Sequence, residues 1–207
     1  MPNKRTILRV CQGCSLGFLA EEGQVKRGNG KFCSPSCVNR PLPVVPASDN
    51  SGAYMVPLTG KQGVIRGYAV VDTADIEHVS QFRWHTDANG YAMRYLPERR
   101  GHISMHRDLL GLSAGDDREC DHINRNKLDN RRNNLRVVTH SQNGQNLPVF
   151  PSVSKYRGVD WLKRNGKWRA RITEGRRTIY LGLFDTEDEA GRAALDARKR
   201  MMPYAVD

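Results

Sequence analysis

The sequence of 207 residues has no apolar run long enough to cross a membrane. Its first ten residues, MPNKRTILRV, also lack the apolar core of a signal peptide. These two absences predict an intracellular, cytoplasmic protein in which thiols remain reduced. Apolar residues make up 38% of the chain and charged residues 27%, which is typical of a soluble globular protein.

Acidic residues are few compared with basic ones. The chain has 22 Asp and Glu against 33 Lys and Arg, which gives a formal net charge of +11. The basic excess is larger in the two flanks than in the middle of the chain. This distribution favours flanking modules that hold a polyanion, and the length allows one to three small domains.

Cysteine is scarce, but four of the five cysteines lie close together within residues 9–40. They form a C-x2-C pair, Cys11 and Cys14, and a C-x3-C pair, Cys33 and Cys37. Two such pairs suit tetrahedral Zn²⁺ bound by four thiolates, and the metal would supply folding energy to a segment with little core. KFCSPSC resembles the second knuckle of treble-clef-like or ribbon-like zinc fingers. Disulfides are the alternative, which a reducing compartment disfavours. We expect a zinc finger over residues 1–40 and a Pro-rich linker over residues 41–52.

Polar groups concentrate between Asp121 and Asn146, in DHINRNKLDNRRNNLRVVTHSQNGQN. Asn and Asp favour turns, so this stretch predicts two short strands joined by a loop. A short helix with Thr139 as its N-cap is expected to follow. Residues 53–120 add short strands, a helix that Thr73 can cap and a hairpin around the Asn89-Gly90 turn, which completes an α+β domain over residues 53–147.

The carboxylate, imidazole and carboxamides of this β-β-α unit suit metal-assisted cleavage of phosphodiesters. Asp121 and the carboxamide oxygen of Asn143 can bind a hard cation such as Mg²⁺ or Mn²⁺. His122 can take a proton from water near neutral pH, and Asn134 can fix the tautomer of its imidazole. Successive residues of a strand point to opposite faces, so Asp121 and His122 share a site only if the strand is twisted or bulged.

At these residues the sequence resembles the HNH endonucleases of the phage and intron-encoded homing branch, through DHIN, NNLR and a Q-N pair on the helix. The resemblance implies that Asp121 and Asn143 bind the catalytic metal, that His122 is the general base and that Asn134 orients it. The last His of the family's name is Asn143 here. His140, one helical turn earlier, is therefore a rival ligand.

A second linker is expected at residues 148–154, followed by a three-stranded antiparallel sheet and a helix over residues 155–204. Along the second strand, apolar residues alternate with Arg169 and Arg171. Along the third strand, Ile179, Leu181 and Leu183 are expected on the apolar face. A T-x-x-E capping box begins the helix, and its small Ala side chains allow it to lie close to the sheet.

YRGV, GKW, YLGLF and the Ala-rich helix resemble the apetala-two/ethylene-response-factor type of DNA-binding domain. The resemblance implies that the sheet enters the major groove of DNA, with Arg157, Arg169, Arg171 and Tyr180 as the contacting residues. Asp160 stands where plant members usually have a contacting Arg, which implies a different sequence preference.

Together these patterns predict a modular α+β protein of phage or mobile-element origin: a site-recognising, metal-dependent endonuclease of the nicking or homing type. Its expected partner is double-stranded DNA, with no membrane and no small-molecule substrate. A monomer with one active site would nick one strand unless it dimerises. The alternative is a sequence-specific DNA-binding regulator with an inactive nuclease fold. An RNA-acting nuclease is the weaker prediction, because a major-groove reader suits B-form DNA.

Overall fold

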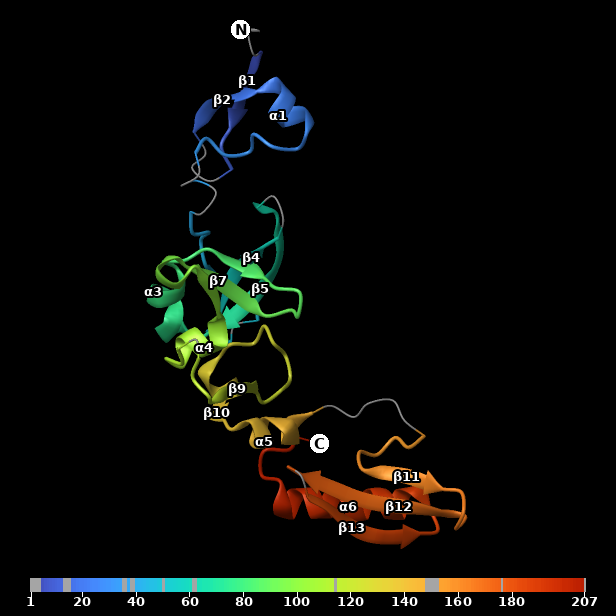
Figure 1. Cartoon of the computed structure of the whole chain (residues 1–207). Helices are drawn as coiled ribbons and strands as arrows, with labels where there is room; N and C mark the ends of the chain where they lie inside the picture. Colours follow the sequence, from blue (N-terminus) through green and yellow to red (C-terminus); the bar gives the residue numbers. More distant parts are fainter. Residues whose placement is uncertain are drawn as a thin grey trace. The chain divides into compact units, whose positions relative to one another are not determined.

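The computed structural model describes residues 5–12, 16–34, 37, 40–49, 51–60, 63–113, 115–147, 153–175 and 177–206. The chain divides into two compact units, one of Met1–Ser113 with Lys127–Arg132 and one of Ala114–Asn126 with Asn133–Asp207. Each unit combines strands with helices, so the predicted α+β class is confirmed (Figure 1). Within the described residues, no helix is both long enough and apolar enough to cross a membrane.

The first unit begins with an antiparallel hairpin of β1 (Thr6–Val10) and β2 (Gly17–Glu21), followed by α1 (Glu22–Lys26). The hairpin has little core: the cross-strand pair Leu8 and Leu19 is 75% and 69% exposed. Among the described residues of the hairpin, Cys11 and Ala20 are buried. A segment with so few buried apolar side chains needs a further source of stability, which a bound metal can supply.

The main body of the first unit is a six-stranded sheet. Its strands are β3 (Val45–Pro46), β4 (Tyr54–Thr59), β5 (Ile65–Val71), β6 (Trp84–Thr86), β7 (Ala92–Leu96) and β8 (Gly101–Ser104). They follow the order β3-β4-β6-β7-β8, with β5 also paired to β4. The turn at Asn89-Gly90 joins β6 to β7 as the sequence predicts, and Gly90 adopts φ +86°, which a glycine reaches without strain.

Short helices complete the first unit: η2 (Thr73–Asp75), α3 (Ile76–Val79), η3 (Pro97–Arg99) and α4 (Met105–Leu109). Val79, Trp84 and Met105 are buried together in the core. The Trp84 indole Nε1 donates to the Val79 carbonyl at 2.9 Å, which satisfies the one polar atom of this large side chain.

The second unit begins with an antiparallel hairpin of β9 (Glu119–His122) and β10 (Leu135–Val138), with η4 (Arg132–Asn134) before β10. The helical segment that follows consists of α5 (His140–Asn143) and η5 (Gly144–Asn146). Thr139 is the N-cap of α5, with a complete capping box to Gln142, as predicted. This is the β-β-α arrangement expected from residues 121–146.

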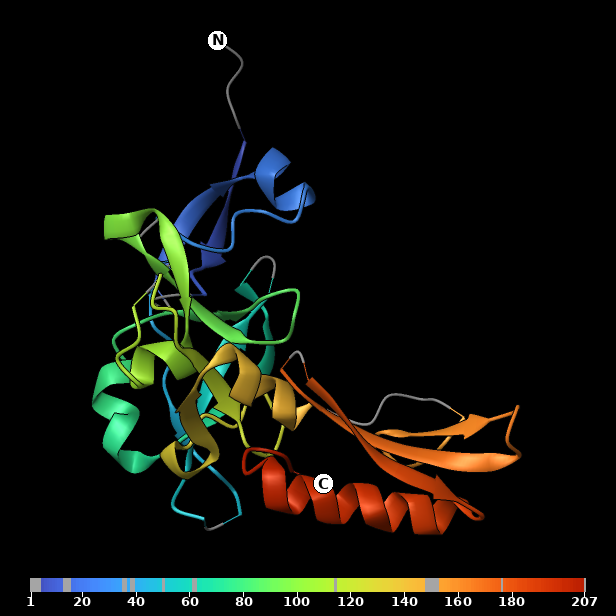
Figure 2. The ribbon, with the colours of Figure 1, turned by 60° about the horizontal axis from the view of Figure 1, so that its bottom comes forward.

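The second unit ends with an antiparallel sheet of β11 (Val159–Leu162), β12 (Lys167–Glu174) and β13 (Arg177–Phe184), followed by α6 (Glu187–Met201). Figure 2 shows α6 lying along one face of this sheet. The core between them is built from small side chains, including Ala170, Ala190 and Ala194. A Cβ on Gly191 would lie 2.5 Å from the Tyr156 ring, so this position of α6 requires glycine.

A β-bulge in this sheet changes the faces that simple alternation predicts. The register between β12 and β13 shifts between Ala170 and Arg171, so Ala170 pairs with Gly182 and Arg171 with Tyr180. Leu183 consequently pairs with Arg169 and lies on the arginine face. The prediction that Leu183 shares the apolar face is therefore wrong, because one extra residue reverses the alternation beyond it.

Candidate functional site

Asp121 is held by the strand opposite it and by the helical segment. It pairs across the hairpin with Arg136, whose Nε and Nη2 donate to Asp121 Oδ2 at 2.8 and 2.6 Å. Asn146 Nδ2 donates to both carboxylate oxygens at 3.0 Å. Arg136 also donates to the Tyr204 carbonyl at 2.6 Å and lies over the Tyr204 ring. The buried carboxylate is thus fixed in one orientation.

Asn146 is a residue that the sequence interpretation missed. Its Nδ2 also donates to the His122 and Ile123 carbonyls, and its Oδ1 accepts from Arg125 Nε at 3.2 Å. Both ends of the carboxamide are therefore occupied. The repeated Q-N pair in HSQNGQN was the signal that could have drawn attention to it, since residues three apart lie on the same side of a helical segment.

Asn143 lies one turn earlier and contacts a different carboxylate. Its Nδ2 donates to Glu119 Oε2 at 2.5 Å, whereas Glu119 Oε1 lies 2.7 Å from His140 Nδ1. Glu119 and Asp121 are two residues apart on β9, so their side chains leave the strand on the same face. The carboxylate–amide pairs Glu119–Asn143 and Asp121–Asn146 therefore line the same side of the hairpin.

His122 is the last residue of β9 and is buried, with 5% of its surface exposed. The pairing is regular through Asp121 and His122, without the bulge that would bring their side chains to one face. Asn134, also buried, accepts at Oδ1 from the Asn124 amide at 2.9 Å, and its carbonyl accepts from the Ile123 amide. Asn134 thus braces the turn that directly follows His122.

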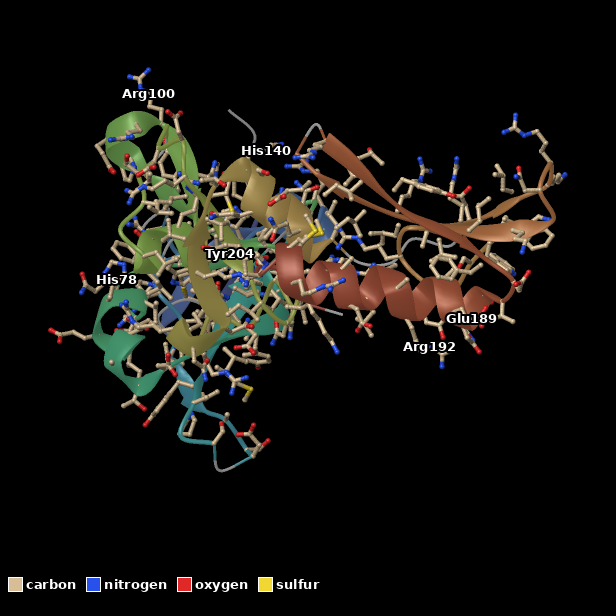
Figure 3. The ribbon with its side chains drawn as sticks, turned by 90° about the horizontal axis from the view of Figure 1, so that it is seen from below. His78, Arg100, His140, Glu189, Arg192 and Tyr204 are labelled. Atoms are coloured by element: carbon tan, nitrogen blue, oxygen red, sulfur yellow. The ribbon has the colours of Figure 1, made fainter. Side chains whose placement is uncertain are left out.

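The donor atoms on this face fit a hard divalent cation. Asp121 offers carboxylate oxygens and Asn143 a carboxamide oxygen, which are the ligand types that Mg²⁺ and Mn²⁺ prefer. The His140 side chain is 93% exposed (Figure 3), and its Nδ1 is directed to Glu119.

A separate group of ligands lies in the N-terminal hairpin region. The Sγ atoms of Cys11, Cys33 and Cys37 all lie within 4.8 Å of one another. The Cys33 amide lies 3.3 Å from Cys11 Sγ, a contact that stabilises a thiolate. Cys14, the fourth predicted ligand, lies outside the described residues. Three thiols so close together can hold one metal ion.

The exposed face of the C-terminal sheet carries three of the four predicted DNA contacts. Tyr180 is 59% exposed and pairs with Arg171, whose side chain is 48% exposed. Arg169 pairs with Asp160 on β11, and its Nη2 lies 2.7 Å from the Asp160 carboxylate. Arg171 lies 3.4 Å from the same carboxylate. Asp160 therefore partly neutralises this face.

Arg157 does not belong to that exposed face. Its guanidinium donates to the carbonyls of Gln145 at 2.6 Å, Leu147 at 3.1 Å and Gly144 at 3.1 Å. Carbonyls at a helix C-terminus lack intrahelical partners and attract cations, so Arg157 caps the end of η5. The adjacent Gly158 leaves no room for a Cβ, which would lie 2.2 Å from the Arg171 carbonyl. These contacts give Arg157 a structural role, and its contact with DNA stays a prediction.

Comparison with known protein families assigns the two segments of the second unit. A family model described as AP2 domain matches residues 154–202, and one described as HNH endonuclease matches residues 116–145. The chain carries an HNH endonuclease domain and an AP2 domain. The resemblances to the HNH endonucleases and to the apetala-two type of DNA-binding domain are thereby confirmed, whereas the phage and homing branch stays a prediction.

Individual relatives match parts of the chain. An uncharacterised HNH endonuclease of Acanthamoeba polyphaga mimivirus is 29% identical over 118 residues, which are 55% of this chain and 59% of the viral protein. APETALA2-like protein 2 of Oryza sativa subsp. indica is 57% identical over 42 residues, 19% of this chain and 9% of the rice protein. The ethylene-responsive transcription factor WRI1 of Arabidopsis thaliana is 49% identical over 43 residues, 20% of this chain and 10% of that protein. No solved structure matches the chain significantly.

Proposed function

We propose that the chain is a metal-dependent HNH endodeoxyribonuclease that hydrolyses phosphodiester bonds of double-stranded DNA. The observation that carries the proposal is the hairpin face on which the carboxylates of β9 meet the carboxamides of the helical segment, with His122 at the end of the same strand. Asp121 and Asn143 would hold the Mg²⁺ or Mn²⁺ ion. When bound, the ion supplies positive charge that stabilises the scissile phosphate and the leaving 3′ oxygen.

In this mechanism His122 is the general base. Its imidazole takes a proton from a water molecule, whose oxygen then bonds to phosphorus as the bond to the 3′ oxygen breaks. The 3′ oxygen takes a proton from solvent. The side chains of His122 and Asp121 leave β9 on opposite faces. His122 is the last residue of the strand, so the two side chains can act on one phosphate only where the strand ends. Asn134 holds the turn there and so positions the imidazole.

The remaining modules would bring the nuclease to its site. Arg169, Arg171 and Tyr180 would contact DNA, which gives sequence preference and salt-dependent affinity. We retain the expected division into a finger over residues 1–40, a nuclease domain over 53–147 and a DNA-binding domain over 155–204, with linkers between them. The enzyme would act as a monomer in the cytoplasm of a host cell and nick one strand, as a homing-type nuclease of phage or mobile-element origin.

The N-terminal finger would be folded around Zn²⁺. Cys11, Cys14, Cys33 and Cys37 are the proposed ligands, and the proximity of three of the four sulfur atoms supports this assignment. Since the surrounding segment buries few apolar side chains, the ion would stabilise the fold and take no part in cleavage.

The second candidate function is a sequence-specific DNA-binding regulator with an inactive nuclease domain. The contacts of Asp121 favour it, because two bonds from Arg136 and two from Asn146 already satisfy this carboxylate. A cation at Asp121 would have to share the carboxylate with a guanidinium.

A plasmid assay separates the two candidates. Supercoiled plasmids carrying DNA sites selected for binding are incubated with the protein in Mg²⁺ or Mn²⁺, with and without EDTA. If the chain is a nuclease, the plasmid should relax in a metal-dependent manner. His122→Ala should abolish this relaxation without a loss of DNA affinity. The control variant His102→Ala, at an exposed histidine, should cut at the parental rate. Binding without any metal-dependent relaxation would establish the regulator instead.

A further inference from the structure

Glu119 joins two side chains of α5 to the hairpin. Its two carboxylate oxygens are divided between them, with Oε1 at 2.7 Å from His140 Nδ1 and Oε2 at 2.5 Å from Asn143 Nδ2. His140 and Asn143 are three residues apart, so they lie on the same side of the helix. Glu119 is therefore placed to orient both side chains on the face where the cation is expected.

The contact with Asn143 decides which end of the carboxamide faces away from Glu119. An ionised carboxylate only accepts hydrogen bonds, so it can bind the NH₂ group of Asn143 and not its oxygen. The Asn143 oxygen is consequently turned away from Glu119 and is available as a ligand. A hard cation binds a carboxamide through this oxygen.

The neighbouring Asn146 is oriented in the opposite sense. Its NH₂ group faces Asp121 and its oxygen is bound by Arg125, so it offers Asp121 a donor and no ligand oxygen. Of the two asparagines in the carboxylate–amide pairs, Asn143 is thus the one whose orientation suits metal binding. That orientation depends on the charge of Glu119.

We propose that Glu119 is a positioning residue of the nuclease site, which fixes the Asn143 carboxamide with its oxygen toward the catalytic cation. The proposal rests on the proposed function, because it presumes a cation held by Asp121 and Asn143. Glu119→Gln is the decisive variant: a glutamine has the same shape but can donate to the Asn143 oxygen, which allows the carboxamide to turn over.

The test measures Mn²⁺ binding to the full chain without DNA, from the free Mn²⁺ signal in electron paramagnetic resonance, with the cysteine group loaded with Zn²⁺ beforehand. Loss of a group that orients a ligand typically weakens metal binding by about 10- to 100-fold. We expect a weakening of roughly tenfold in Glu119→Gln, a larger loss in Asn143→Ala and none in Glu98→Gln, which changes a carboxylate of η3.

Nicking assays supply the second readout. In Glu119→Gln the Mn²⁺ concentration for half-maximal nicking should rise by the same factor as the dissociation constant, whereas the rate at saturating Mn²⁺ should stay near the parental value. Parental Mn²⁺ affinity in Glu119→Gln, with an unchanged melting temperature, would overturn the positioning role even if the parental protein cuts DNA. If the parental protein binds Mn²⁺ in an Asn143- and Glu119-dependent manner but does not cut, the proposed function fails and the positioning role stands.

Discussion

Replacement of Arg157 by alanine separates a structural arginine from a DNA-contacting one. The guanidinium donates three hydrogen bonds to carbonyls at the end of η5, at 2.6, 3.1 and 3.1 Å. A hydrogen bond to a charged group contributes about 1.5–3 kcal/mol, and a cation at a helix C-terminus about 0.3–1 kcal/mol. Water can replace part of the lost bonding at the exposed Leu147 end, so we expect a loss of about 2 kcal/mol in stability. For a protein of this size that lowers the melting temperature by roughly 4–8 °C.

The matched control is Arg171→Ala on the exposed face of the sheet. Arg171 makes one long ion pair at 3.4 Å, and exposed ion pairs contribute about 0–1 kcal/mol. The melting temperature of the Arg171→Ala protein should therefore change little. Its affinity for DNA should instead fall roughly tenfold, the loss expected for one specific arginine contact. Scanning calorimetry and fluorescence anisotropy below both melting temperatures give the two readouts. A stable Arg157→Ala protein with a tenfold loss of DNA affinity would refute the assignment of Arg157 as a helix cap.

Three further changes test the DNA face, the cysteine group and the acid sensitivity of the fold. Asp160→Asn removes the carboxylate that partly neutralises the arginine face, so DNA binding should tighten several-fold at low salt and less at high salt; an unchanged anisotropy titration would place DNA elsewhere. Cys33→Ser should lower the zinc content found by mass spectrometry of the purified protein and reduce thermal stability, whereas Cys120→Ser should leave both unchanged. Burial raises the pKa of Asp108, but hydrogen bonds led by that from Arg94 outweigh it and hold this pKa below its ordinary value. Asp108 therefore stabilises the fold above about pH 4, the range of an unfolded Asp, and this contribution disappears as pH falls through the lower folded pKa. Urea unfolding should accordingly show a smaller loss of stability below pH 4 in Asp108→Asn than in the parental protein.

Local sequence was sufficient where a structure depends on neighbours along the chain. Thr139 and Thr186 begin helices through capping boxes that need only a residue three positions later. The Asn89-Gly90 turn likewise depends on two adjacent residues. The capping of a helix at Thr73 was predicted wrongly, because the Thr73 hydroxyl donates instead to the carbonyl of Gly52, a residue distant in the chain.

The site was less predictable, because its contacts depend on how the hairpin and the helical segment meet. Asn143 and Asn146 are equally plausible partners of Asp121 from their spacing, and the structure places Asn146 there. Glu119 was not singled out, because nothing in the local sequence shows that it reaches Asn143. The cross-strand pairing of Arg136 with Asp121 depends on the register of the hairpin, which the loop between the strands does not reveal.

The sequence by itself determined which chemical groups this protein possesses and in which order its modules follow. The DHIN and NNLR segments, the spaced cysteines and the alternating C-terminal strands are readable because they involve short separations along the chain. The tertiary structure decided what each group faces: Arg157 caps a helix, a bulge moves Leu183 to the arginine face, and Glu119 accepts a hydrogen bond from Asn143. These outcomes depend on register and on contacts between distant segments, where a displacement of one residue exchanges one partner for another.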